Sequence, residues 1–279
     1  MNPGSDSRKS NNLPTVSPDG NTKILPVTNQ NIVLERPVMI AGFPDSGMIG
    51  SVTINHIIEQ LNMHQIAYIE SQHVMPAAIF IGKRFRHAFR IYANDSGTVC
   101  ALICEVPVTA RGTYSIINTI VDWCMNATVS EIVVLGGILP SNFSPPYLLE
   151  RKAMLLRNEL AEEPSGQSPR SADALGMAVP DDAIIVGLPG SLLSVCAARG
   201  LGCSALMIPT MTESPDPEGA AIVLEALPKI VPGLNIDTSS LRLKAEMIKK
   251  HLEEFLKMHR QQLQDYERTA NRETERIYK

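Results

Sequence analysis

The segment GFPDSGMIG (42–50) has residue types that suit a ligand site. It follows an apolar run at 37–43 and precedes a helical pattern, so its backbone N–H groups can bind an anion at a helix start. The spacing matches neither a dinucleotide-binding glycine motif nor a phosphate loop ending in Gly-Lys-Ser/Thr. The structural alternative is a tight turn in which the glycines allow close packing and Asp45 caps the helix.

Three other side chains are candidates for the site of an enzyme. Ser46 would need a base to act as a nucleophile, and the neighbouring sequence supplies none. Glu105 and Arg111 flank the end of a predicted strand, where open α/β sheets place their sites, although structural ion pairs explain them equally well. The acidic segment ESPDPE (213–218) suits a metal site or, without any ligand, the start of a helix.

Charge and composition argue against several classes of function. The net charge is −4, without the basic surplus typical of a nucleic-acid-binding protein. The five cysteines form no Cys-x-x-Cys pair and the six histidines are scattered, which predicts buried thiols and neither a metal nor a cofactor site. No apolar run reaches the roughly 18 residues of a membrane helix, and the N-terminus lacks the apolar core of a signal peptide. We therefore expect a cytoplasmic protein that binds no membrane.

Short apolar runs alternate with helical patterns along most of the chain. This alternation predicts an α/β fold with a largely parallel sheet covered on both faces. The runs 77–82 and 89–95 are predicted to pair as a hairpin around the basic stretch KRFRH (83–87). The predicted strands cover 37–43, 65–70, 77–82, 89–95, 98–107, 131–138, 182–190 and 203–210, and the predicted helices 48–62, 113–126, 191–202 and 218–232.

The composition divides the chain into three parts. Residues 1–30 are rich in Asn, Ser, Pro and Gly, which predicts a flexible tail. Residues 31–236 form one α/β domain, interrupted by a Pro/Ser-rich surface loop at 161–176. Residues 237–279 are predicted to be a helical extension, capped by Asp237 and Thr238.

An apolar stripe at 4-3-4-3 spacing marks the start of this extension. Such a stripe fits either a coiled-coil seam between copies of the chain or a helix docked on its own domain. A stripe of two heptads is too short to distinguish the coiled-coil seam from the docked helix. The stripe consists of Leu241, Ala245, Ile248, Leu252 and Phe255.

Five motifs occur in an order that resembles the archaeal form of the proteasome assembly chaperone family, over about residues 32–258. They are GFPDSGMIGS (42–51), GGILP (136–140), IIVGLPGSLL (184–193), ESPDPEGAAIVLEAL (213–227) and LNIDTSSLRLKAEMI (234–248). The resemblance implies a three-layer α/β/α sandwich akin to nucleoside phosphorylases, no established catalysis, and homo-oligomers that act on proteasome α-subunits. The residues that match the family's turn motif are Gly42, Pro44, Asp45, Gly47 and Gly50.

The last three residues gain a meaning from this resemblance. Ile277, Tyr278 and Lys279 are a hydrophobic residue, a tyrosine and a terminal residue, which is similar to the docking tail of proteasome activators. We therefore expect a proteasome-binding protein, either assembly chaperone or core-particle activator, that docks on the α-ring through this tail. The alternative is an enzyme of the nucleoside-phosphorylase type that binds an anion at the Gly42–Gly50 turn.

Overall fold

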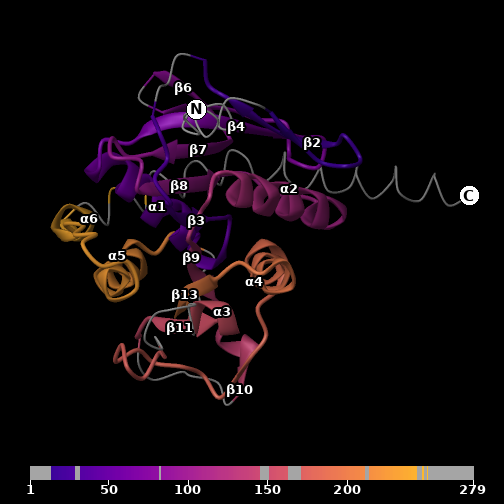
Figure 1. The fold of residues 1–279 in the computed structure, drawn as a ribbon. Coiled ribbons are helices and arrows are strands. Elements are labelled where there is room, and N and C mark those ends of the chain that lie inside the picture. Colours follow the sequence, from indigo (N-terminus) through magenta and orange to yellow (C-terminus); the bar gives the residue numbers. More distant parts are fainter. Residues whose placement is uncertain are drawn as a thin grey trace, which may run out of the picture.

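A sheet of nine strands runs through the molecule in the order β1-β2-β4-β7-β8-β3-β9-β13-β11 (Figure 1). The computed structural model describes residues 14–28, 32–81, 83–144, 151–162, 171–210 and 214–243, together with Met247 and Lys250. The strands of this sheet are β1 (Thr15–Val16), β2 (Thr22–Pro26), β3 (Val38–Gly42), β4 (His64–Ser71), β7 (Phe89–Ala93), β8 (Val99–Cys104), β9 (Glu131–Ile138), β11 (Met154–Arg157) and β13 (Cys203–Pro209).

The sheet is mixed, and the expectation of a largely parallel sheet holds only for its centre. Strands β8, β3, β9 and β13 are parallel neighbours, whereas β1, β2, β4 and β7 on one side and β11 on the other pair in antiparallel fashion. The link between β7 and β8 is too short for a crossover helix, so it makes a hairpin. The α/β class predicted from the alternating pattern is confirmed.

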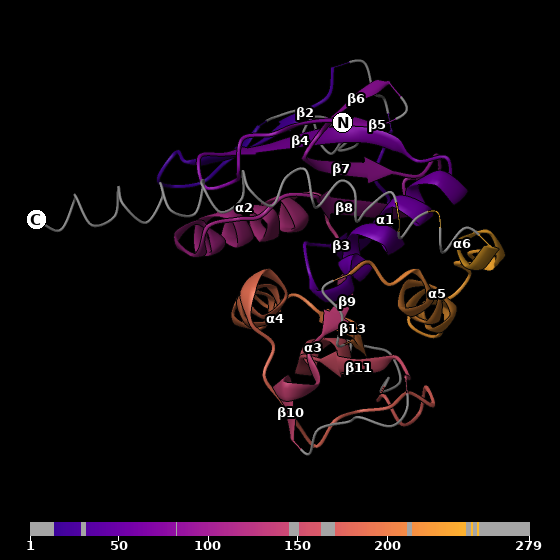
Figure 2. The ribbon, with the colours of Figure 1, turned by 180° about the vertical axis from the view of Figure 1, so that it is seen from behind.

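Helices cover both faces of the central strands (Figures 1 and 2). α1 (Ile49–Gln60), α5 (Pro217–Ala226) and the short α6 (Ser239–Leu243) pack together on one face, and α2 (Thr113–Asn126) and α4 (Gly187–Arg199) pack on the other. A further helix, α3 (Glu159–Glu162), lies beside β11 and β13. Within the described part of the chain, no helix has the length and apolarity needed to cross a membrane.

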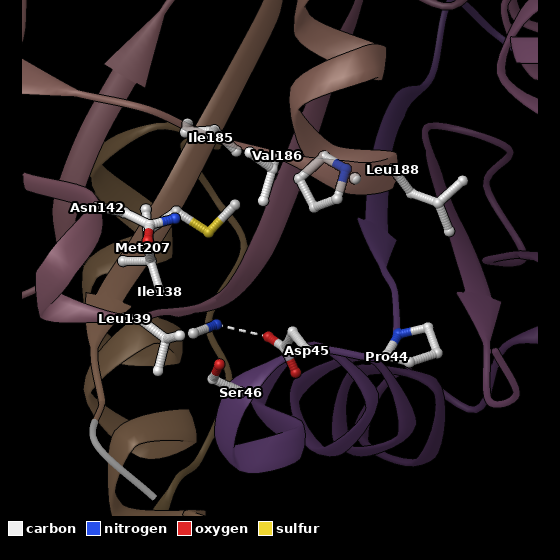
Figure 3. A pocket seen from close by; sticks show the side chains of 13 residues that line it. Pro44, Asp45, Ser46, Ile138, Leu139, Asn142, Ile185, Val186, Leu188 and Met207 are labelled. Atoms are coloured by element: carbon white, nitrogen blue, oxygen red, sulfur yellow. Dashed lines mark hydrogen bonds between the residues drawn. The ribbon is translucent and has the colours of Figure 1, made fainter. Parts of the chain in front are cut away.

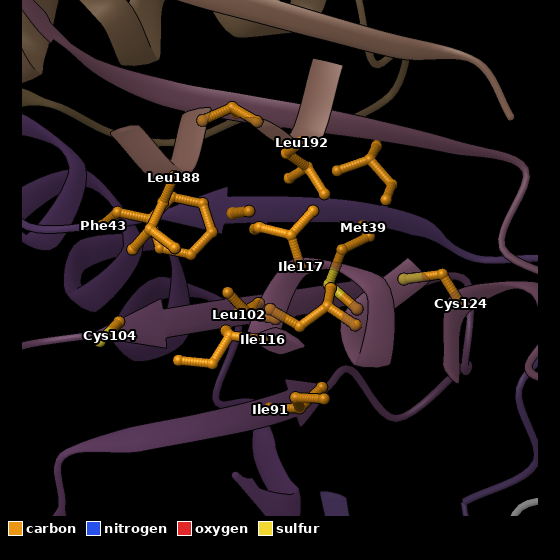
Figure 4. Packing of buried hydrophobic residues seen from close by; sticks show 14 of the residues in the cluster. Met39, Phe43, Ile91, Leu102, Cys104, Ile116, Ile117, Cys124, Leu188 and Leu192 are labelled. Atoms are coloured by element: carbon orange, nitrogen blue, oxygen red, sulfur yellow. The ribbon is translucent and has the colours of Figure 1, made fainter. Parts of the chain in front are cut away.

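Each face of the sheet has its own apolar core, because alternate residues of a strand point to opposite faces. The core under α2 and α4 contains Met39, Phe43, Leu102, Ile117 and Leu192, all of them buried (Figure 4). The other core lies under α1 and α5 and is built from aliphatic side chains, among them Ile40, Ile54, Ile103, Leu135 and Leu224.

The prediction of a flexible tail over residues 1–30 is wrong for residues 14–28, which contain β1 and β2. Strand β2 lies between β1 and β4 in the sheet, and Thr22 and Ile24 are completely or almost completely buried. The Thr22 hydroxyl lies 3.0 Å from Ser71 Oγ and 3.2 Å from Ser115 Oγ, so a polar residue joins the core with its hydrogen bonds satisfied. The segment is polar in composition, and long-range pairing orders it.

The predicted hairpin also has a different pairing. β5 (Ala78–Ile81) pairs with β6 (Arg84–His87), so most of the stretch KRFRH forms a strand, and β7 joins the main sheet instead. A second small sheet pairs β10 (Phe143–Ser144) with β12 (Asp182–Ala183). Of the strand and turn expected at 182–190, the strand is only two residues long, and α4 begins already at Gly187.

The chain after α5 packs back onto the domain as far as it is described. The His56 ring lies 2.7 Å from the Asp237 carbonyl oxygen, and the Asp237 side chain accepts the Ser239 N–H at 2.9 Å. Leu241 is buried beside α5. Four members of the predicted stripe, namely Ala245, Ile248, Leu252 and Phe255, lie outside the described residues, as do residues 163–170 of the predicted loop and the terminal tripeptide.

Candidate functional site

A pocket of about 290 Å³ opens at the carboxyl ends of the parallel strands (Figure 3). Ends of neighbouring parallel strands are the usual place for a site in an α/β sheet. One wall comes from the turn after β3, a second from the end of β9, and a third from the segment that enters α4. The lining consists of Pro44, Asp45, Ser46, Gly137, Ile138, Leu139, Asn142, residues 185–189 and Met207.

Asp45 fastens the turn after β3 to two other elements. Its carboxylate accepts the N–H of Gly50 in α1 at 3.0 Å and that of Gly137 at the end of β9 at 2.5 Å. The expectation that Asp45 caps the helix holds only for its carboxylate, which accepts the first-turn N–H of Gly50, because the N-cap position of α1 is occupied by Met48. In the phosphorylase alternative, a bound anion would accept hydrogen bonds from the backbone N–H groups of this turn. The N–H groups of Gly50 and Gly137 already donate to the Asp45 carboxylate, so they are not available to a ligand.

Burial raises the pKa of Asp45 to about 8, against the backbone hydrogen bonds, which lower it. Backbone N–H groups are dipoles and bring no positive charge, so they do not cancel the cost of enclosing an anion. Since the remaining lining residues carry no charged side chain, the pocket is close to neutral at pH 7.

The glycines of the turn are required by close approach between backbones. A Cβ on Gly42 would lie 2.3 Å from the Gly50 carbonyl oxygen, and one on Gly50 would lie 2.7 Å from the Phe43 oxygen. Gly137 belongs to the same contact, because a Cβ there would be 2.1 Å from the Ser46 oxygen. The start of α1 therefore sits directly on β3 and β9, which supports the close-packing interpretation of the motif.

The acidic motif after β13 packs against the same turn. The Asp216 N–H donates to the Gly47 carbonyl at 2.8 Å, and its carboxylate caps α5 by accepting the Gly219 N–H at 2.9 Å. Arg151 pairs with the same carboxylate. Helix capping thus explains Asp216 without a metal, and the described residues contain no group of three or more potential ligands that could hold one.

Glu105 belongs to a different cluster, at the end of β8. It pairs with Arg90 of β7 and accepts the Asn55 side-chain amide of α1 at 3.1 Å. The Arg90 side chain is 1% exposed, and its guanidinium lies over the Tyr92 ring, 5.6 Å from the centroid. Its Nε and Nη1 atoms find no hydrogen-bond partner among the described residues. This ion pair was not predicted, because an arginine inside an apolar run gives no local signal that it is buried.

The three residues nominated for an enzyme do not converge on the pocket. Ser46 lines it, but neither Glu105 nor Arg111 is among the lining residues. Arg111 lies in a short 3₁₀ turn before α2. The pocket walls at 137–139 and 185–189 fall in two of the motifs used for the resemblance, although the spacing of these motifs alone did not indicate a shared cavity.

The prediction of buried thiols is confirmed, since all five cysteines are free and buried. Burial raises the pKa of both Cys100 and Cys104 to about 12. Thiolate is the reactive form of cysteine, so these side chains are poor nucleophiles at neutral pH.

The PAC2 family model matches residues 39–256, which is most of the chain. The match includes the Asp45 turn, the pocket walls and the acidic motif described above.

Among solved structures, a protein of unknown function from Thermoplasma acidophilum is 31% identical, with 82% of this chain and 91% of that chain covered and a TM-score of 0.67. Pyrococcus furiosus PbaA, described as an archaeal homolog of proteasome-assembly chaperone, is 22% identical, with 88% and 99% covered and a TM-score of 0.71. Pyrococcus furiosus PbaB, described as an archaeal proteasome activator, is 21% identical, with 84% and 98% covered and a TM-score of 0.61. Because PbaA and PbaB are only 22% and 21% identical, their likeness to this chain shows a shared fold alone.

Proposed function

The chain belongs to the PAC2 family, and on this premise we propose that it is a cytoplasmic proteasome-binding protein, acting as an assembly chaperone or as a core-particle activator. The observation that carries the proposal is the family match over 39–256, together with a fold shared with PbaA and PbaB. The fold leaves the two roles open, because one of these neighbours is described as a chaperone homolog and the other as an activator.

We propose the terminal tripeptide Ile277-Tyr278-Lys279 as the docking element for the α-ring. The terminal carboxylate would pair with a lysine of the ring, while the tyrosine and the isoleucine would fill an apolar cleft. One such tail buries little surface and binds weakly, so several tails on a homo-oligomer are needed for tight binding. For the predicted stripe we propose the docked-helix alternative, which is supported by the burial of its first residue, Leu241, beside α5 of the same domain.

The pocket chemistry supports a binding role over the phosphorylase alternative. Asp45 already occupies donors that an anion would need, and Glu105 is engaged by Arg90 and Asn55 outside the pocket. An enzyme of that type would also need a cationic side chain beside the phosphate, and none is among the residues that line the pocket.

Surface plasmon resonance on an immobilised proteasome α-ring tests the docking element. The full chain should bind, and the chain without residues 277–279 should lose affinity by on the order of tenfold or more through lost avidity. Tyr278→Ala should weaken binding through lost packing. One residue added after Lys279 should weaken it too, because the addition moves the carboxylate and leaves every side chain in place. Equal affinity of full and shortened chains would rule out the tail as the docking element.

Two further measurements separate the chaperone from the activator. An activator raises peptide hydrolysis by an assembled core particle, whereas a chaperone raises the yield of core particles from separate subunits and is absent from the product. A chain that neither binds α-subunits nor changes either measurement would contradict the proposed function as a whole.

A further inference from the structure

Two surfaces of the molecule are complementary to each other, and they lie at opposite ends of it. The first is the outer side of the β5–β6 hairpin, and the second is the mouth of the pocket with the adjoining β12. In both views the hairpin lies at one end of the molecule and the β10–β12 sheet at the other (Figures 1 and 2). A single copy cannot bring them together without unfolding, but two copies can.

The hairpin presents an aromatic knob surrounded by positive charge. Phe80 and Phe85 are cross-strand partners whose ring centroids lie 5.8 Å apart, and they are 67% and 57% exposed. Ile79 next to them is buried, so the hairpin is anchored while the two rings face solvent. Lys83 and Arg84 are exposed beside the rings and form no ion pair with any described residue.

The pocket mouth presents an apolar hollow beside negative charge. Leu139, Ile184 and Val186 are 45%, 69% and 67% exposed, and the first and last of them line the pocket. Asp181 and Asp182 are exposed next to Ile184 and have no ion-pair partner among the described residues. Large apolar side chains that gather around a pocket indicate an interaction surface.

The pocket is large enough for a phenylalanine ring of the hairpin, and the charges beside the hairpin and the pocket mouth have opposite signs. A cavity of about 150 Å³ accommodates a benzene molecule, so a pocket of about 290 Å³ has room for a phenylalanine ring. Lys83 and Arg84 follow Phe80 in the hairpin, and Asp181 and Asp182 precede Ile184, so the two surfaces carry opposite charge. Opposite charges at an interface favour the correct partner and orientation.

We infer that the chain associates head to tail, with the Phe80–Phe85 knob of one copy in the Leu139–Ile184–Val186 pocket mouth of the next. Because the two surfaces differ, the contact is heterologous and extends either into a closed ring or into an open chain. The inference names the contact for the homo-oligomer on which the proposed function rests, and it can be tested without a proteasome.

Light scattering after size exclusion, at micromolar concentrations, gives the first test. The wild type should be several times heavier than the 30.4 kDa monomer. Phe85→Asp and Val186→Asp should each reduce it to the monomer mass, because a charge replaces an exposed apolar side chain in the contact. Val33→Asp is the matched control, since Val33 is 60% exposed and belongs to neither surface, and it should keep the wild-type mass.

Mixing the two variants provides the sharper test. Each retains one intact surface, so an equimolar mixture of Phe85→Asp and Val186→Asp should form a species of twice the monomer mass and nothing larger. A monomeric wild type, a mixture that stays monomeric, or a Phe85→Asp variant of wild-type mass would each overturn the inference. Circular dichroism of each variant checks its folding, and we expect all of them to fold because the substituted side chains are exposed.

Charge reversal gives an independent measurement. Arg84→Glu and Asp182→Arg should each lower the oligomer mass, whereas the double variant, in which opposite charges meet again, should regain it. Failure of the double variant to regain mass, with both single variants reduced, would contradict the proposed pairing of hairpin and pocket mouth.

Discussion

Two carboxylates near the ends of the adjacent strands β3 and β8 are held in different ways. Asp45 is bonded by the backbone N–H groups of Gly50 and Gly137, without a cation, and burial raises its pKa to about 8. Glu105 is paired with the guanidinium of Arg90 and with the Asn55 amide. The two residues are similar chemically, and what differs is whether a neighbour brings charge or only a dipole.

The two regions are therefore stabilised by different interactions. The Asp45 turn depends on the backbone, so its geometry is controlled by glycines and by three elements that meet at one point. The Arg90–Glu105 pair depends on two side chains, so each member is costly to remove while the other remains. Substitutions in the two regions should therefore have different magnitudes and different pH dependence.

The largest effect is expected for Glu105→Gln. The substitution keeps the shape of the side chain but leaves the guanidinium of Arg90, 1% exposed, without its carboxylate. Breaking a buried pair in this way costs about 3–5 kcal/mol of unfolding free energy. Urea denaturation followed by circular dichroism measures it.

Glu225→Gln is the matched control for this prediction. Glu225 pairs with Arg242 at the surface, where solvent screens the interaction, so its substitution should cost much less. Equal losses for the two variants would show that burial does not strengthen the Arg90–Glu105 pair.

A smaller loss is expected for Gly50→Ala in the other region. Alanine favours a helix over glycine by about 1 kcal/mol, but the added Cβ would lie 2.7 Å from the Phe43 oxygen and 2.9 Å from the Leu135 oxygen. Both are backbone atoms, so the clash should outweigh the propensity and cost about 1–3 kcal/mol. Gly202→Ala, whose Cβ would have ordinary contacts of 3.5 Å, should be near neutral in the same assay. A stable Gly50→Ala variant would contradict the close-packing interpretation.

The third expected effect is one of pH dependence, in Asp45→Asn. The pKa of Asp45 rises from 3.8 to about 8 on folding, so between these pH values the folded state binds a proton that the unfolded state does not. The unfolding free energy of the wild type therefore falls as pH rises through this window, and the asparagine variant lacks this contribution.

Chemical denaturation between pH 5 and pH 9 measures the difference. The stability of Asp45→Asn relative to the wild type should rise with pH and level off above about pH 8. Ser46→Ala keeps the carboxyl group at the neighbouring position, so its stability relative to the wild type should not depend on pH. A flat profile for Asp45→Asn would mean that the backbone N–H groups offset the burial of the charge.

The sequence by itself determined the elements whose signals are local. The helix at 113–126 and the strand at 131–138 have the predicted bounds, because apolar periodicity and flanking turn residues lie within each segment. The role of Asp45 as an acceptor at the start of α1 was predictable for the same reason, since Gly50 is only five positions away. The alternation of such elements was enough for the α/β class.

Tertiary structure decided the features that depend on distant partners. Strand β2 is ordered by β4, more than forty residues away, and the burial of Arg90 depends on Glu105 in the next strand and Asn55 in a helix. The pocket brings together the turn after β3, the end of β9 and the entry to α4, three segments whose separation along the chain hides their contact. Local propensity is contained in neighbouring residues, whereas burial and ion pairing depend on which segments the fold brings together.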